Sequence, residues 1–232
     1  MKRSYFIITG TSRGIGKELA RALLDKDDFV FGISRGAPTE LAKHNNYSHT
    51  HLDLKNIHSI ETVIKEIFNQ IDLNQRGTIC LINNAAMLEP LKTIDRCSLE
   101  EINNGLQVSL IAPMALTACF INQSQHSSMK RKVINITSGS GTYPAPSMSV
   151  YCAAKAGINM FTQCVGAEQS KHENPIEIIA FDPGMVDTEL QKMAREKDEQ
   201  DFELAGLFKQ VHQSGQLQTT EDVVKTLITG YL

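Results

Sequence analysis

Short apolar runs rich in β-branched residues alternate along the chain with longer amphipathic stretches. Each run has about the length of a strand, and they lie at residues 5–9, 29–33, 78–82, 133–136 and 176–181, with a weaker one near 48–52. Between them, apolar residues recur at helical spacing, for example over 19–24, 60–67 and 158–165. Strands that are apolar on both faces and alternate with helices indicate a parallel sheet covered on both sides. We therefore predict an α/β fold with a doubly wound parallel sheet.

The composition agrees with one globular domain over residues 1–232. The chain is 41% hydrophobic and 21% charged, and no repeat, low-complexity tract or Gly/Ser linker divides it. Its formal net charge is −3, so the broad basic field that attracts nucleic acids is missing. We expect no nucleic-acid partner.

Targeting and membrane segments are also not expected. The apolar run near the start breaks at Thr9 and Gly10, too early for a secretory signal, and no apolar run in the sequence approaches membrane-spanning length. The chain has an odd number of cysteines, widely spaced within apolar segments: Cys80, Cys97, Cys119, Cys152 and Cys164. This pattern favours reduced thiols over disulfides and predicts a cytoplasmic protein.

A glycine-rich loop follows the first predicted strand and leads directly into a helical pattern. Ligands of doubly wound sheets bind beyond the carboxyl ends of the strands, where such a loop lets the backbone approach a pyrophosphate at a helix N-terminus. Strand, loop and helix in this order indicate a Rossmann-type dinucleotide site, although a tight turn without a ligand is the alternative. The predicted contacts in the loop are Gly10, Ser12, Arg13, Gly14, Ile15 and Gly16.

The ends of the next three strands refine this cofactor prediction. No acidic residue follows the second strand, and Arg35 stands there instead. Together with Arg13, it would bind the 2′-phosphate of a cofactor, which favours NADP(H). The alternative is that both arginines are simply solvated. Asp53 would either accept a hydrogen bond from adenine or cap the following helix. Asn83 and Ala85 follow the fourth strand, where a cofactor would pass closely.

A possible catalytic group lies further along the chain. Tyr151 and Lys155 are four residues apart at the start of a predicted helix, so they share one face, and a nearby ammonium would lower the pKa of the phenol. Such a phenol can act in general acid–base catalysis, with Ser138 after the fifth strand hydrogen-bonding a carbonyl oxygen. Tyr-x-x-x-Lys by itself is common by chance.

In combination these motifs resemble the short-chain dehydrogenase/reductase family. The matching pieces run in the family order over nearly the whole chain: residues 9–16, Asp53, residues 83–86, Ser138, Tyr151 with Lys155, and Pro183-Gly184 with Thr188. The resemblance implies a sheet order of 3-2-1-4-5-6, a dinucleotide-binding half up to about residue 135 and a catalytic half from about 136. Within the family, the sequence most resembles the sepiapterin-reductase-like branch. That branch includes bacterial benzil reductases, which form (S)-benzoin with NADPH.

The resemblance also implies roles for individual residues. The serine orients the substrate, the tyrosine transfers the proton, and the lysine binds the nicotinamide ribose and lowers the tyrosine pKa. The segment with Pro183, Gly184, Val186 and Thr188 would cover the nicotinamide.

Three departures from the family pattern bear on these expectations. Ala86 replaces a glycine and is tolerated if its φ is negative. Ser109 stands where the family has a catalytic asparagine; it keeps a main-chain carbonyl for the proton relay, but the shorter side chain is expected to lose the asparagine's help in fixing a helix distortion. The sequence ends after a helical stretch at 220–231, so six strands are expected unless the natural chain is longer.

The resemblance implies that the residues around the substrate are apolar. None of them is an obvious charged partner for a charged substrate, so we expect a small neutral carbonyl compound. Tyr143, Met185 and Leu190 are the predicted contacts, and the wider set is Met87, Leu88, Pro144, Val186 and Met193. Residues 192–203 are dense in both charge signs and are expected to form a solvated lid helix. His49 and His51 lack further ligands at zinc spacing, so no metal is expected.

The resulting hypothesis is an oxidoreductase, an NADPH-dependent carbonyl reductase acting on a ketone or aromatic 1,2-diketone. A 3-oxoacyl-carrier-protein reductase is the alternative enzyme, disfavoured because no cationic patch is evident near the lid. An NADP(H)-binding sensor with weak catalysis is the alternative of another class, motivated by Ser109. A homodimer is expected to form through the long helices around 100–120 and 151–170.

Overall fold

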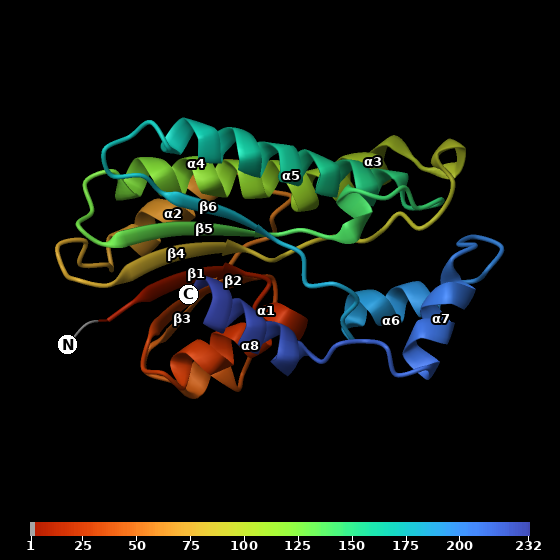
Figure 1. Ribbon diagram of the computed structural model, residues 1–232, viewed down its shortest axis with the longest axis horizontal. Coiled ribbons are helices and arrows are strands. Elements are labelled where there is room, and N and C mark those ends of the chain that lie inside the picture. The colour runs from red at the N-terminus through yellow and green to blue at the C-terminus, as the bar shows by residue number, and fades with distance from the viewer. Residues whose placement is uncertain (1–2) are drawn as a thin grey trace.

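Six parallel strands form the centre of the computed structural model, which describes residues 3–232 (Figure 1). The strands are β1 Tyr5–Thr9, β2 Phe29–Ser34, β3 Tyr47–His51, β4 Thr78–Asn83, β5 Lys130–Ile136 and β6 Glu177–Phe181. They pair in the order β3-β2-β1-β4-β5-β6, which confirms the predicted doubly wound sheet. All six therefore end at the same edge.

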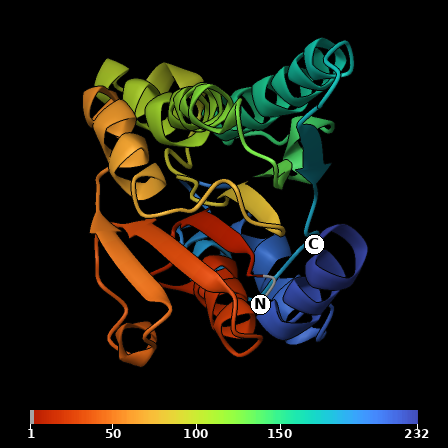
Figure 2. The ribbon, with the colours of Figure 1, turned by 90° about the vertical axis from the view of Figure 1, so that its left-hand side faces the viewer.

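Helices cover both faces of this sheet, so the molecule has three layers (Figures 1 and 2). On one face lie α1 Gly14–Leu24 and α8 Thr220–Tyr231; on the other lie α2 Ile60–Phe68, α3 Leu99–Leu106, α4 Ala112–Ser124 and α5 Ser149–Gln169. The shorter α6 Glu189–Arg195 and α7 Ala205–Gln213 lie beyond the carboxyl edge. Side chains alternate along a strand, so Ile7 and Ile8 enter the apolar cores on opposite faces.

One helical run is longer and more apolar than the sequence suggested. Leu99–Ser124 is a continuous run of 26 residues with an 18-residue window of mean hydropathy 1.5, which by length and composition alone can cross a membrane. The expectation concerned uninterrupted apolar runs, and it holds for this segment because polar residues interrupt it. In the structure Leu116 and Phe120 on this helix are fully buried in the core shared with α2 and the sheet.

The middle of this run is a π-helical turn, Gln107–Ile111, that contains Ser109. The Ser109 side chain is buried; its Oγ donates to the carbonyl of Met87 over 3.2 Å and accepts from the Met87 N–H over 2.9 Å. A helix distortion is thus present, and the serine hydroxyl joins it to the segment after β4. The serine side chain thus gives this turn two backbone hydrogen bonds, and the weaker support expected relative to an asparagine stays a prediction.

Replacing Ser109 with Ala is expected to lower the free energy of unfolding by about 1–3 kcal/mol, because both backbone groups of Met87 lose a buried partner. Chemical denaturation measures this change. Ser170→Ala is the matched control, since the Ser170 hydroxyl is exposed and bonds only within its own helix end. Equal free energies for the two variants would show that the Ser109 bonds contribute nothing.

Candidate functional site

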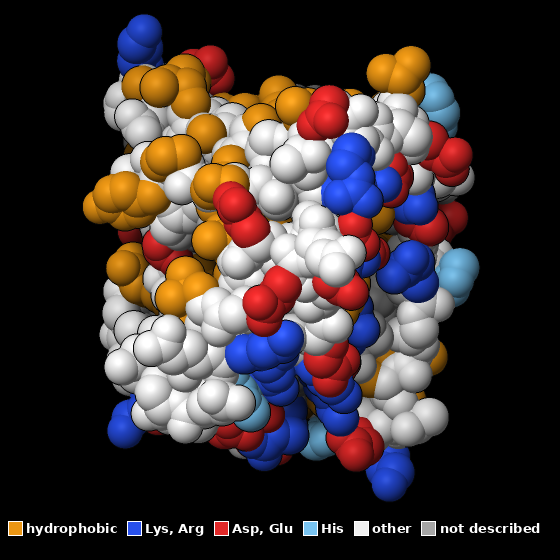
Figure 3. Space-filling model, turned by 90° about the vertical axis from the view of Figure 1, so that its right-hand side faces the viewer, with side chains coloured by type: hydrophobic (Ala, Val, Ile, Leu, Met, Phe, Trp, Pro, Cys, Tyr) orange, Lys and Arg blue, Asp and Glu red, His pale blue; other side chains and the backbone are white. Residues whose placement is uncertain are grey.

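A cavity of about 840 Å³ opens at the carboxyl edge of the sheet. Figure 3 looks onto this side, where hydrophobic side chains gather on one flank and acidic and basic side chains alternate across the middle. The cavity is lined by most of the predicted residues: Gly10, Ser12, Arg13, Gly14, Ile15, Arg35, Asp53, Ala85, Ser138, Tyr143, Tyr151, Lys155, Pro183, Gly184, Met185, Val186, Thr188 and Leu190. Gly16, Asn83 and Ser109 lie outside its lining.

The glycine loop is held against the end of β4 by Asn84. The Asn84 amide donates to the Thr9 carbonyl over 2.8 Å, and a Cβ built on Gly16 would lie only 2.5 Å from this amide nitrogen. Gly10 has a φ of +78°, which side chains other than glycine rarely adopt. Glycine at these two positions lets helix α1 start close to β1 and β4.

Asn83, in contrast, turns into the core. Its side-chain amide donates to Asn135 Oδ1 over 2.8 Å and to Thr117 Oγ1 over 3.1 Å, and the residue is buried between β4, β5 and α4. Successive residues at the end of a strand face opposite sides, so only one of the two asparagines can face the cavity. The structure does not bring Asn83 to the site, and Asn84 takes that place.

Two exposed arginines, Arg13 and Arg35, line the same end of the cavity. The turn that carries Arg35 is fixed by Ser34, whose Oγ donates to the Gly36 carbonyl over 2.8 Å and shares a 3.1 Å hydrogen bond with His49 Nε2. No local sequence pattern indicates this support, because Ser34 and His49 meet only through the pairing of β2 with β3.

Asp53 also lines this end, and its Oδ1 accepts from the Lys55 N–H over 3.0 Å. That bond fixes a local turn. Thr188 lies against the glycine loop, with Cγ2 3.6 Å from a Cβ built on Gly14. The segment after β6 therefore reaches the cavity from the opposite side.

Tyr151 and Lys155 lie together at the other end of the cavity, beside Ser138. Lys155 is 3% exposed; its Nζ donates to the Ile136 carbonyl over 2.7 Å and lies 5.6 Å from the centroid of the Tyr151 ring. Burial lowers the pKa of Lys155 to about 8, against an opposing effect of the Asp182 carboxylate.

The same burial raises the pKa of Tyr151 to about 12; a hydrogen bond with Ser138 lowers it, and the charge of Asp182 raises it further. The direction is therefore opposite to the lowering expected from the Lys155 ammonium, and loss of hydration is its largest cause. With this pKa the phenol keeps its proton at neutral pH. Tyr151 is thus in the form that can donate a proton.

Apolar residues close the cavity around this pair. A buried cluster that includes Leu88, Met148 and Phe202 packs against Tyr151. Tyr143 and Met185 are 72% and 40% exposed and lie at the mouth. All the apolar residues that the resemblance gathered here do line the cavity.

The charged stretch 192–203 is not the single helix that we expected. Helix α6 ends at Arg195, a turn follows, and α7 begins at Ala205. The break lets Phe202 bury completely, with its ring centroid 5.6 Å from that of Phe208. Residues of this α6–α7 unit, 189–213, line the cavity, and we call the unit the lid.

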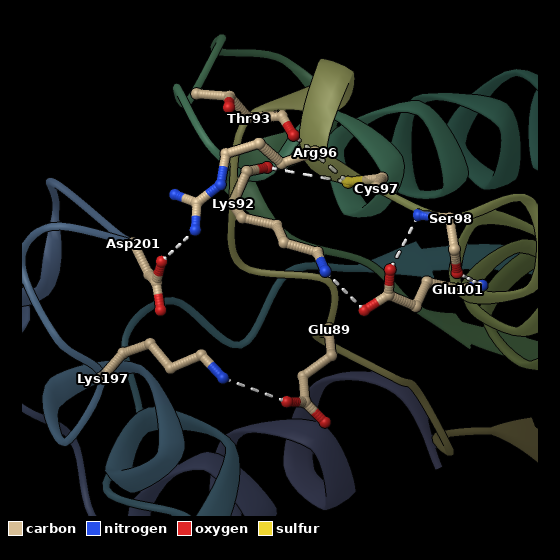
Figure 4. A network of polar contacts seen from close by, with 9 residues as sticks. All are labelled: Glu89, Lys92, Thr93, Arg96, Cys97, Ser98, Glu101, Lys197 and Asp201. Carbon is tan, nitrogen blue, oxygen red and sulfur yellow. Dashed lines mark hydrogen bonds and ion pairs between the residues drawn. The ribbon is translucent and has the colours of Figure 1, made fainter.

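Ion pairs connect the lid to the segment after β4 (Figure 4). Lys197 Nζ lies 3.4 Å from Glu89 Oε1, and Arg96 Nη2 lies 2.5 Å from Asp201 Oδ1. All four side chains are partly exposed, so each pair contributes little stability. These ion pairs therefore hold the lid only weakly against the segment after β4.

Neither a metal cluster nor a disulfide is found in the part of the chain that the structure describes. No group of three or more His, Cys, Asp or Glu side chains there is placed to hold a metal ion. The five cysteines are free; Cys80 is buried, whereas Cys164 is exposed and does not belong to the core.

Known proteins with similar sequences are oxidoreductases, as the geometry of the cavity suggests. The short chain dehydrogenase family matches residues 4–199. A benzil reductase ((S)-benzoin forming) from Bacillus cereus is 39% identical over 228 residues, covering 96% of this chain and 92% of that relative. A sepiapterin reductase from Bos taurus is 28% identical over 209 residues, covering 84% of this chain and 77% of that relative.

The fold has close counterparts among solved structures. The crystal structure of the KRED1-Pglu enzyme superposes with a TM-score of 0.82 at 24% identity, covering 95% of this chain and 91% of that one. The resemblance drawn from the motifs is confirmed. This chain belongs to the short chain dehydrogenase family and is an oxidoreductase that acts on carbonyl or alcohol groups.

Proposed function

We propose that the protein reduces a neutral ketone or aromatic 1,2-diketone to an alcohol, with NADPH as the hydride donor. The observation that carries this proposal is the buried Tyr151 and Lys155 pair beside Ser138, in a cavity whose other end is the glycine loop. Reducing a ketone needs a hydride at carbon and a proton at oxygen, and the two ends of the cavity suit these two requirements.

The residues present fit a nicotinamide dinucleotide. The glycine loop lines the cavity at the start of α1, where Gly10 and Gly14 have positive φ and the free N–H groups of the helix N-terminus can bind a phosphate. Arg13 and Arg35 favour the cofactor with a 2′-phosphate, since guanidinium groups bind phosphate through paired hydrogen bonds. Lys55 adds a third cation at this end.

The bound cofactor would supply the hydride that the carbonyl carbon accepts. Tyr151 donates its phenolic proton to the carbonyl oxygen, and its high pKa keeps that proton available at neutral pH. Ser138 stabilises the charge on the same oxygen by hydrogen bonding. Lys155, anchored on the Ile136 carbonyl, retains donors for the nicotinamide ribose.

The substrate chamber favours flat, uncharged compounds. Its lining includes Met87, Leu88, Pro144, Leu190 and Met193, which offer apolar surface to an aromatic ring. The relative from Bacillus cereus is named for benzil, an aromatic 1,2-diketone. Benzil is therefore the first substrate to test.

The remaining expectations concern the setting of the enzyme. We infer that residues 1–232 act as one domain, because both halves contribute to the cavity. The free cysteines suit the reducing cytoplasm. Partly exposed Ile111, Met114 and Met160 on the long helices support the expected homodimer. The two hydrogen bonds of Ser109 to Met87 support the π-helical turn at this position, which favours the reductase over the sensor alternative.

Tyr151→Phe is expected to lower kcat for benzil by about 10²–10⁴-fold, because the proton donor is removed. Loss of NADPH absorbance measures turnover, and NADPH fluorescence checks that the cofactor still binds. Tyr231→Phe removes a hydroxyl from α8 and should turn over at the wild-type rate. Full activity of Tyr151→Phe would contradict the proposed role, and wild-type protein without turnover of any ketone would contradict the proposed function.

Replacing Arg13 and Arg35 together with Ala is expected to raise KM for NADPH by about 10–100-fold, since charge-assisted hydrogen bonds to the 2′-phosphate are lost. KM for NADH should change little. Arg76→Ala is the matched control, because Arg76 precedes β4 and lies at the opposite edge of the sheet. An equal effect on both cofactors would show that the two arginines do not recognise the 2′-phosphate.

The rate of reduction is expected to fall as pH rises through about 8. The folded-state pKa of Lys155 is about 8, so its ammonium is present below that pH and lost above it, whereas Tyr151 stays protonated over this range. A pH profile of kcat/KM with saturating NADPH measures the fall. Lys155→Arg keeps the charge and should remove the fall, even if its rate is lower. A wild-type profile that is level to about pH 10 would contradict this assignment.

A further inference from the structure

Asp182 is a cavity residue that the sequence analysis did not select. It follows β6 directly, and the parallel register of Ile136 with Phe181 brings it beside the segment that contains Ser138. Its Oδ2 lies 3.7 Å from a Cβ built on Gly139, and its Oδ1 accepts from the Gly184 N–H over 2.9 Å. The carboxylate is therefore fixed in position at the catalytic end of the cavity.

The charge of Asp182 acts on the two groups that carry the chemistry. It raises the pKa of both Tyr151 and Lys155. Within residues 3–232 no Lys, Arg or His forms an ion pair with Asp182, whereas Glu89 at the same cavity pairs with Lys197. The negative charge of Asp182 thus balances the positive charge of the Lys155 ammonium. The catalytic end of the cavity therefore keeps little net positive charge.

We propose that Asp182 determines substrate specificity by charge: it disfavours carbonyl compounds that carry a carboxylate next to the reacting carbonyl, and so favours neutral dicarbonyl compounds. This inference rests on the proposed function. At a pH well below 8, where Lys155 keeps its charge, the ammonium without Asp182 would attract a 2-oxo acid to the site. With Asp182, the added carboxylate of such an acid meets a like charge at the cavity wall.

Two probes of similar shape separate charge from size, namely benzoylformate, an anion, and its neutral methyl ester. Wild-type protein should bind and reduce the ester in preference to the anion. Asp182→Asn keeps an acceptor for the Gly184 N–H and is expected to raise kcat/KM and affinity for benzoylformate by about tenfold, with the ester changed less than about threefold. Asp182→Glu keeps the charge and should keep the wild-type preference.

Binding of both probes to the NADPH complex is measured by calorimetry, so the test does not depend on turnover. Glu177→Gln, at the other end of β6, makes the same change in net charge and should keep the wild-type preference. An unchanged preference in Asp182→Asn would overturn the inference while leaving the proposed function intact. An equal shift in Glu177→Gln, or failure of the wild type to bind either probe, would also overturn it. Probe binding without reduction of any ketone would contradict the proposed function alone.

Discussion

The parallel alignment of the strands is the constraint on which the rest of the molecule depends. Because all six strands end at one edge, residues from distant parts of the chain meet there: the glycine loop after β1, Asn84 after β4, Ser138 after β5 and Asp182 after β6. Cross-strand hydrogen bonds, such as that from Thr137 N–H to the Phe181 carbonyl, fix their relative positions. The cavity is thus a consequence of strand register rather than of any one loop.

Burial then sets the chemistry at this edge. Taking a phenol and an ammonium out of water favours the neutral form of each, which is why Tyr151 holds its proton more tightly and Lys155 less tightly. A carboxylate at the cavity wall strengthens the first effect and opposes the second. The same three groups can therefore keep the acid protonated and leave the substrate chamber nearly without net charge.

Two kinds of contact hold the lid against the rest of the molecule, namely apolar packing and ion pairs. Phe202 anchors it in an apolar cluster that also contacts Tyr151, so the lid and the catalytic end share packing. The ion pairs with Glu89 and Arg96 are partly exposed and easily exchanged for water.

The sequence by itself determined the elements, the sheet order, the family and most of the cavity residues. Apolar periodicity and the glycine, Tyr and Lys spacings are local signals, and the family order of motifs adds the topology. Only the tertiary structure decided that Asn84 and not Asn83 faces the cavity, and that Ser109 bonds to Met87. It also decided the direction of the Tyr151 pKa shift, the break in the lid and the place of Asp182. These features depend on burial and on contacts between residues far apart in the chain. A local sequence pattern cannot indicate either of them.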